Sequence, residues 1–224
     1  MSDQESGGHY SHALHYAWLT SIYDPVVRLT CREAKFKKEL VQQVGASPGE
    51  SVLDLGCGTA TLSILLKKAF PEAEIVGLDG SDQILEIAKE KVKGAGAQIT
   101  FLHALSYEIP VEDNHFDRVV SSFFFHHLNR YDKKRTLDEV YRVLRPAGEL
   151  HVADWGKPPN TLFRLAFGIV QLLDGFETTR DSVEGILPVY MEKTGLEGVK
   201  ATGRVLTPLG SVSLYKAAKP GERA

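Results

Sequence analysis

The chain has 224 residues, of which 25% are charged, and its formal net charge is −3. This length fits one domain with a substantial core, and the charge gives no indication of a nucleic-acid-binding surface. The two cysteines, Cys31 and Cys57, are too few for a disulfide framework or a zinc cluster, and the polar residues 1–10 contain no apolar signal segment. The composition therefore predicts a cytoplasmic protein without a bound metal.

The first half of the chain predicts a helical segment followed by strands that alternate with helices. A helical pattern runs up to residue 44 and is interrupted at Pro25. The apolar runs 52–55 and 75–79 predict two buried strands. Between them, the spacing of apolar residues from Leu62 to Ala69 predicts an amphipathic helix, and Ser81 is a suitable N-cap for the next helix.

The same alternation continues in the middle of the chain. We expect strands at 98–102 and 118–122. Apolar residues at helical spacing from Leu137 predict a helix that ends at Pro146 and Gly148, and a further strand should follow. That strand covers residues 149–155.

The last third contains a strongly apolar run, a helix and two β-rich runs. Residues 162–173 are apolar on nearly every face, but they are too few to span a bilayer, which needs about 20 residues. We favour a buried helix here; a lid over an acceptor pocket and an interfacial membrane contact are the alternatives. One helix ended by Gly195 should follow. Residues 199–206 and 211–216 then flank a turn sequence and predict an antiparallel hairpin.

The most informative stretch is Asp54-Leu55-Gly56-Cys57-Gly58-Thr59. It predicts a buried strand, a tight glycine loop and a helix N-terminus, where a ligand can approach the backbone closely. About 20 residues later the second strand ends at Asp79, where a carboxylate can hold a ribose diol. The pattern indicates a nucleoside-containing cofactor. An NAD(P)-dependent oxidoreductase is the weaker alternative, because the third glycine of a dinucleotide loop is replaced by Thr61.

Several motifs, in their order and spacing, resemble those of class I S-adenosylmethionine (SAM) dependent methyltransferases. They are the glycine loop, Asp79-Gly80-Ser81, the run 116–122 and the helix–turn–strand sequence at 141–150. The resemblance covers roughly residues 45–217 and is nearest to the ubiquinone and menaquinone C-methyltransferase branch. It implies a Rossmann-like α/β sandwich, with helices on both faces of a seven-stranded sheet whose last strand is antiparallel. We accordingly expect an N-terminal helical lid at 1–44, a methyltransferase domain at 45–217 and a tail at 218–224.

The resemblance also implies how SAM, or its product S-adenosylhomocysteine (SAH), is held. The backbone of Gly56 and Gly58 and the hydroxyl of Thr59 would bind the methionine carboxylate. Asp54 would brace this loop or reach the methionine amino group through water, and Asp79 would bind the ribose. Ile84 would pack against the adenine face, and Ser122 would lie near the sulfonium. Gly80 and Ser81 of the second motif would also line the site, and Tyr23 would close over it as part of the lid.

The chain departs from the family pattern at the adenine edge. Relatives carry an Asp or Asn followed by a small residue, and this chain has Leu105 and Ser106. Leu105 cannot accept a hydrogen bond from the adenine amino group, whereas the Ser106 backbone N–H can donate to a ring nitrogen. Losing one neutral hydrogen bond costs on the order of 1 kcal/mol, so SAM binding should be weakened. The departure keeps open a SAM-fold protein that has no methyltransferase turnover or catalyses another SAM-assisted reaction.

Candidate catalytic residues follow the fourth and fifth strands. His126 is the first candidate for a general base, because it comes just after a cofactor strand and titrates near neutrality. His127 and Asp154 are the next candidates. The expected reaction is C- or O-methylation of a small lipophilic or aromatic acceptor by a cytoplasmic monomer or homodimer. Neither a nucleic-acid partner nor a membrane contact is expected.

Overall fold

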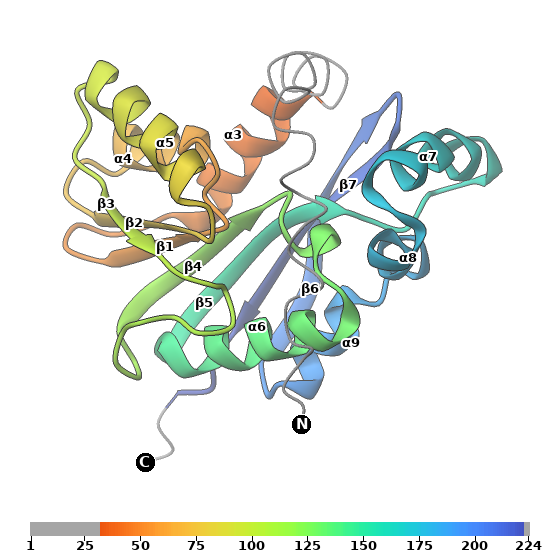
Figure 1. Cartoon of the computed structure of the whole chain (residues 1–224). Helices are drawn as coiled ribbons and strands as arrows, with labels where there is room; N and C mark the ends of the chain where they lie inside the picture. Colours follow the sequence, from red (N-terminus) through yellow and green to blue (C-terminus); the bar gives the residue numbers. More distant parts are fainter. Residues whose placement is uncertain (1–31, 222–224) are drawn as a thin grey trace, which may run out of the picture.

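The computed structural model describes residues 32–221, without the side chains of Asp174 and Glu177, as one sheet with helices packed on it (Figure 1). Its strands are β1 (Ser51–Leu55), β2 (Glu74–Asp79), β3 (Thr100–His103), β4 (Phe116–Ser122), β5 (Leu144–Trp155), β6 (Glu197–Thr207) and β7 (Gly210–Ala218). Its helices are α3 (Glu33–Val44), α4 (Thr61–Ala69), α5 (Asp82–Gly94), the short 3₁₀ helix η1 (Phe125–His127), α6 (Arg130–Val143), α7 (Thr161–Asp174), α8 (Phe176–Glu184) and α9 (Leu187–Lys193).

The sheet has the strand order β3-β2-β1-β4-β5-β7-β6. Neighbouring strands from β3 to β5 pair in parallel, whereas β7 pairs antiparallel with both β5 and β6. The predicted seven-stranded sheet with its antiparallel last strand is therefore confirmed. A dinucleotide-binding sheet of the Rossmann type is mostly parallel, so this topology favours the methyltransferase prediction over the oxidoreductase alternative.

The strand order reverses between β1 and β4, and this point defines the edge where a ligand is expected. Leu55 at the end of β1 lies opposite both Leu78 of β2 and Ser121 of β4. The carboxyl ends of these parallel strands therefore meet at one edge. Ligands of open α/β sheets bind outside such a switch point.

Helices cover both faces of the sheet. Figure 1 shows α3, α4 and α5 on one face and α6 and α9 on the other, with α7 and α8 at one end. Phe36 and Leu40 of α3 are fully buried against β-strand residues such as Val120. Residues 33–44, predicted as part of a lid, therefore belong to the packed core. The rest of the predicted lid, residues 1–31, lies outside the described residues.

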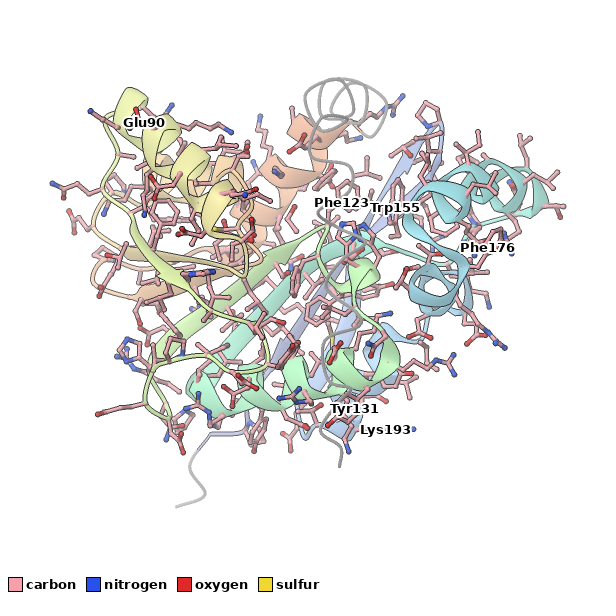
Figure 2. All side chains as sticks on the ribbon, viewed as in Figure 1. Glu90, Phe123, Tyr131, Trp155, Phe176 and Lys193 are labelled. Carbon is pink, nitrogen blue, oxygen red and sulfur yellow. The ribbon has the colours of Figure 1, made fainter. Side chains whose placement is uncertain are left out.

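Helix α7 corrects the prediction of a buried helix. Phe167 and Val170 on its inner face are buried, but Leu165 and Leu172 are 72% and 74% exposed. Figure 2 shows this helix, with Phe176 just after it, at the outer end of the molecule. The run is apolar on nearly every face, so its sequence pattern could not reveal that only one face has a packing partner. No helix in the described part of the chain is long and apolar enough to cross a membrane.

Two element boundaries also differ from the prediction. The single helix expected before Gly195 is two helices, α8 and α9, because Gly185 takes a left-handed conformation with a φ of +71°. Helix α6 ends at Val143, and β5 begins at once with Leu144. The predicted hairpin is confirmed, since β6 and β7 pair across the turn at Thr207 and Gly210.

Candidate active site

The glycine loop after β1 is held against β2 by backbone hydrogen bonds. The N–H groups of Gly56 and Cys57 both donate to the Leu78 carbonyl, at 2.9 Å each. Gly56 and Gly58 have φ values of +70° and +53°, which glycine adopts without the steric penalty of a side chain. The chain can therefore turn sharply after β1 and enter α4, as the glycine pattern predicts.

Asp79 ties this loop to the start of α5. Its Oδ2 accepts a hydrogen bond from the Gly58 N–H at 2.9 Å, and its Oδ1 accepts one from the Ser81 N–H at 3.0 Å. Ser81 caps α5, as predicted, because its Oγ accepts a hydrogen bond from the Ile84 N–H. Each oxygen of an ionised carboxylate can accept more than one hydrogen bond, so both retain capacity for a ribose hydroxyl. The bracing role of Asp79 was not predicted from the sequence.

Asp54 and Thr59 are bonded to the helices beside the loop. Asp54 is buried, and its Oδ2 accepts a hydrogen bond from the Ser63 hydroxyl of α4 at 2.5 Å. Burial raises the pKa of Asp54 to about 6, and the bond from Ser63 opposes this shift. Thr59 Oγ1 accepts a hydrogen bond from Nζ of Lys91 in α5 at 3.3 Å. Lys91 was not a predicted site residue, and it brings an ammonium group next to the expected carboxylate site.

The space around this edge fits a ligand at some positions and not at others. A Cβ atom at Gly58 would meet no heavy atom within 4 Å. A Cβ atom at Gly56 would lie 2.2 Å from Cδ2 of Phe124, so the missing side chain there makes room for this ring and not, as predicted, for a ligand. The Ser122 hydroxyl at the end of β4 is buried and has no hydrogen-bond partner among the described residues. The open side of Gly58, the Asp79 carboxylate and the Ser122 hydroxyl fit a nucleoside-containing ligand such as SAM.

Gly80 and Ile84 complete the second motif. The Gly80 carbonyl accepts a hydrogen bond of 3.2 Å from Nε2 of His103, which ends β3 directly opposite Asp79. Ile84 is half-buried in the first turn of α5. His103 was missed by the sequence reasoning, although its place at the end of a strand was an available signal.

Leu105 and Ser106 lie in the turn that follows β3. Leu105 is half-buried, and its carbonyl accepts a hydrogen bond from the Glu108 N–H at 3.0 Å. Ser106 is buried, and its hydroxyl shares a hydrogen bond of 2.8 Å with the Thr136 hydroxyl of α6. The side chain of Ser106 is therefore turned toward α6. Only the backbone of this residue is available to a nucleoside.

Aromatic rings cluster beside the carboxyl ends of β4 and β5. Phe123, at a φ of +52°, is in a conformation that bulky residues rarely adopt, and its N–H donates to the Ala153 carbonyl at 2.9 Å. The Phe123 ring lies 4.7 Å from that of Phe36. It also lies 4.9 Å from the ring of Trp155 (Figure 2). Trp155 in turn lies 5.4 Å from Phe167 of α7. These rings form a largely buried apolar cluster that runs from α3 to α7.

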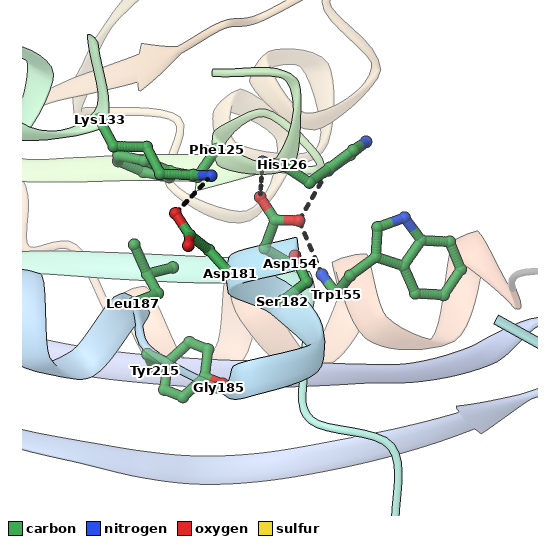
Figure 3. Close-up of a pocket in the computed structure, with 10 residues that line it drawn as sticks. All are labelled: Phe125, His126, Lys133, Asp154, Trp155, Asp181, Ser182, Gly185, Leu187 and Tyr215. Atoms are coloured by element: carbon green, nitrogen blue, oxygen red, sulfur yellow. Dashed lines mark hydrogen bonds and ion pairs between the residues drawn. The ribbon is translucent and has the colours of Figure 1, made fainter. Parts of the chain in front are cut away.

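His126 and Asp154 form a buried pair beside this cluster (Figure 3). Nδ1 of His126 lies 2.7 Å from Oδ1 of Asp154. An ionised carboxylate can only accept hydrogen bonds, so we assign the proton to Nδ1, which makes Nε2 the basic nitrogen of the ring. The sequence named both residues as catalytic candidates, and the fold brings them into contact.

Asp154 is held as an anion by its surroundings. Burial raises the pKa of this carboxyl, but the charge and hydrogen bond of His126 and the Trp155 N–H outweigh burial and keep the pKa below its ordinary value. The N–H groups of Phe124 and His126 also donate to its Oδ2, at 3.2 and 3.3 Å. Asp154 is therefore suited to orient His126 and not to take up a proton. His127 is exposed, with its ring 3.9 Å from that of His126.

A second buried pair shares a small cavity with His126 and Asp154 (Figure 3). Lys133 of α6 donates from Nζ to Oδ2 of Asp181 at 3.1 Å and to the Thr178 carbonyl at 3.0 Å. The cavity has a volume of about 10 Å³, close to the space of one water molecule. Lys133 and Asp181 fasten α8 to α6. Because they are far apart in the chain, no local pattern could have identified the pair.

The two remaining predictions concern a lid residue and metal-ligating side chains. Tyr23, expected to close over the cofactor, lies outside the described residues. Within residues 32–221 no group of three or more metal-ligating side chains occurs.

The chain is similar to known methyltransferases in sequence. A protein family described as "Methyltransferase domain" matches residues 52–148. A demethylmenaquinone methyltransferase of Thermus thermophilus is 34% identical over 149 residues, which are 66% of this chain and 67% of the relative. A demethylmenaquinone methyltransferase of Listeria monocytogenes is 36% identical over 126 residues, 55% of this chain and 52% of the relative. The chain thus spans about half the length of the Listeria enzyme.

Solved structures show the same fold at lower sequence identity. A putative O-methyltransferase of Nostoc punctiforme has a TM-score of 0.68 at 21% identity, over 84% of this chain and 57% of the other. A phosphoethanolamine N-methyltransferase of Haemonchus contortus, solved in complex with SAM, has a TM-score of 0.65 at 18% identity, over 83% of this chain and 52% of the other.

Proposed function

Because the chain belongs to the class I SAM-dependent methyltransferases, we propose that it methylates a lipophilic quinone-type acceptor with His126 as the general base. The quinone class is supported by the names of the Thermus and Listeria relatives. We expect a cytoplasmic enzyme, monomeric or homodimeric, that has no nucleic-acid partner.

The residues at the ends of β1 and β2 would hold SAM. Asp79 would accept hydrogen bonds from the ribose hydroxyls with the lone pairs that Gly58 and Ser81 leave unused. The loop backbone at Gly58 and the Thr59 hydroxyl would hold the methionine carboxylate, and Lys91 adds a favourable charge. When bound, SAM supplies an electrophilic methyl group on a sulfonium.

The remaining cofactor contacts would come from the strand ends and the lid. The buried Ser122 hydroxyl would find a partner near the methionine part of the ligand. Ile84 and the Ser106 backbone would contact the adenine, and Tyr23 would close over the site. The single domain would comprise residues 45–217, with the lid in the N-terminal segment.

The single observation that carries the acid–base assignment is the buried His126–Asp154 pair. A hydroquinone must lose a proton when its oxygen or ring carbon is methylated, so a base beside the acceptor accelerates the transfer. Nε2 of His126 would take this proton. The Asp154 anion would hold the ring in the required tautomer and stabilise the imidazolium that forms.

The test is a comparison of His126→Asn with His127→Asn in a methyl-transfer assay with a short-chain demethylated quinol. We expect His126→Asn to lower kcat by about 100-fold or more while SAH affinity, measured by isothermal titration, stays within the error of wild type. His127→Asn is the matched control and should retain most of the activity. Equal activities of the two variants would contradict the assignment of the base.

Leu105 provides a test of the alternative that the fold binds SAM without turnover. Leu105→Asp restores an acceptor at the adenine edge, and we expect SAH affinity to rise by about 10-fold, the equivalent of about 1.5 kcal/mol for one hydrogen bond to a charged group. SAH binding to the wild type without methyl transfer to any quinol would favour the non-catalytic alternative. An unchanged affinity in Leu105→Asp would mean that another group already serves the adenine edge.

A further inference from the structure

Helix α7 carries an unpartnered apolar stripe on its outer face. Its described residues with large exposed apolar side chains, together with the first residue of α8, are Leu162, Leu165, Ile169, Leu172, Leu173 and Phe176, and each is between 52% and 74% exposed. The spacing of the five α7 residues places them along one side of that helix, and Phe176 follows just after its C-terminal end. We call this set the α7 stripe.

The opposite side of the same helix packs into the core next to the carboxyl end of β5, at the acceptor edge of the proposed site. Phe167 is fully buried, and its ring lies 5.4 Å from that of Trp155. Trp155 follows Asp154 directly and lies beside Phe123 (Figure 2). One helix therefore packs into the core next to Trp155 with one face and presents an apolar surface to the outside with the other.

The stripe is a narrow ridge and not a broad patch. A helix of 14 residues is about 21 Å long and about 10 Å wide, which gives a footprint of roughly 200 Å². An amphipathic helix that lies in the plane of a lipid interface inserts a ridge of this shape among the headgroups.

We propose that the α7 stripe docks the enzyme on a lipid surface, from which the acceptor reaches the site past α7. This inference rests on the proposed function, since a lipophilic quinone partitions into a bilayer and not into water. Docking would bring the acceptor edge to the place where such an acceptor is dissolved. Apolar insertion, and not charge, drives the contact, because Arg164 and Asp174 are the only charged residues in α7 and have opposite signs.

The experiment is flotation of the full chain with vesicles of phosphatidylcholine alone and of phosphatidylcholine mixed with phosphatidylglycerol. We expect binding to both vesicle types with little effect of added salt. The double variant Leu165→Glu/Leu172→Glu should lower the partition coefficient by about 100-fold, since two exposed leucines no longer enter the interface. The matched control is Ile87→Glu, which places the same charge on α5 at a side chain that is 57% exposed.

Two further readouts separate this inference from the proposed function. SAH affinity and melting temperature should match wild type in both variants, because the substituted side chains are exposed. Turnover of a long-chain demethylated quinol embedded in vesicles should fall in the double variant, whereas turnover of a short-chain soluble quinol should not. No vesicle binding by wild type, or equal binding by the double variant, overturns the docking surface even if SAH binds. A dimer that the double variant dissociates, without vesicle binding, would assign the stripe to a second copy of the chain and also overturn it.

Discussion

Replacing Asp79 with alanine separates its expected ribose contact from its observed bracing role. In the structure the carboxylate accepts the Gly58 and Ser81 N–H groups at 2.9 and 3.0 Å. Asp79→Ala leaves both amides without this partner, and water can replace it only in part because Asp79 is half-buried. The variant should therefore lose stability as well as ligand affinity.

The two effects have different expected sizes. Hydrogen bonds to a charged group contribute about 1.5–3 kcal/mol each, and partial rehydration reduces the loss of stability to about 2 kcal/mol in total. For a protein of this size that lowers the melting temperature by about 5 °C. Loss of the bonds to two ribose hydroxyls costs about 3 kcal/mol of binding free energy, so SAH affinity should fall by about 100-fold.

The assay combines isothermal titration with SAH and thermal unfolding without ligand. Asp82→Ala is the matched control, because it removes an exposed carboxylate from the first turn of the same helix. We expect the control to change SAH affinity by less than about 2-fold. A lowered melting temperature with unchanged SAH affinity in Asp79→Ala would refute the ribose contact and leave Asp79 as a brace alone.

Two further predictions concern stability. Gly56→Ala should cost about 3 kcal/mol of unfolding free energy, because φ is +70° and the new Cβ would overlap the Phe124 ring. Denaturant unfolding measures this loss, and it should be smaller for Gly58→Ala, where the space is open. Comparable losses in both variants would mean that the ring moves aside. Burial lowers the pKa of His151 to about 4, so on acidification the unfolded state takes up this proton before the folded state does. His151 therefore lowers the free energy of unfolding by about 2 kcal/mol as the pH falls from about 7 to about 5. His151→Gln should remove that share of the pH dependence in unfolding curves at the two pH values, and an unchanged slope would contradict a neutral buried ring.

Much of the candidate site could be predicted because local patterns specify it. The glycine loop, the N-cap at Ser81 and the acid that ends β2 each depend on neighbouring residues, and the structure places them as the pattern indicates. The same reasoning could not reveal that Phe124 fills the space over Gly56 or that Lys91 reaches Thr59. These contacts join residues about 30 or more positions apart, and no periodicity records them.

By itself the sequence determined the order of strands and helices, the closing hairpin and the edge where a nucleoside should bind. Those features follow from side-chain periodicity and from the backbone freedom of glycine, which act within a few residues. The tertiary structure alone decided that Asp154 orients His126, that Lys133 is neutralised by Asp181, and that α7 is buried on one face only. The partner of a buried charge, and the side chains that cover an apolar helix face, come from distant parts of the chain, and only folding brings them together.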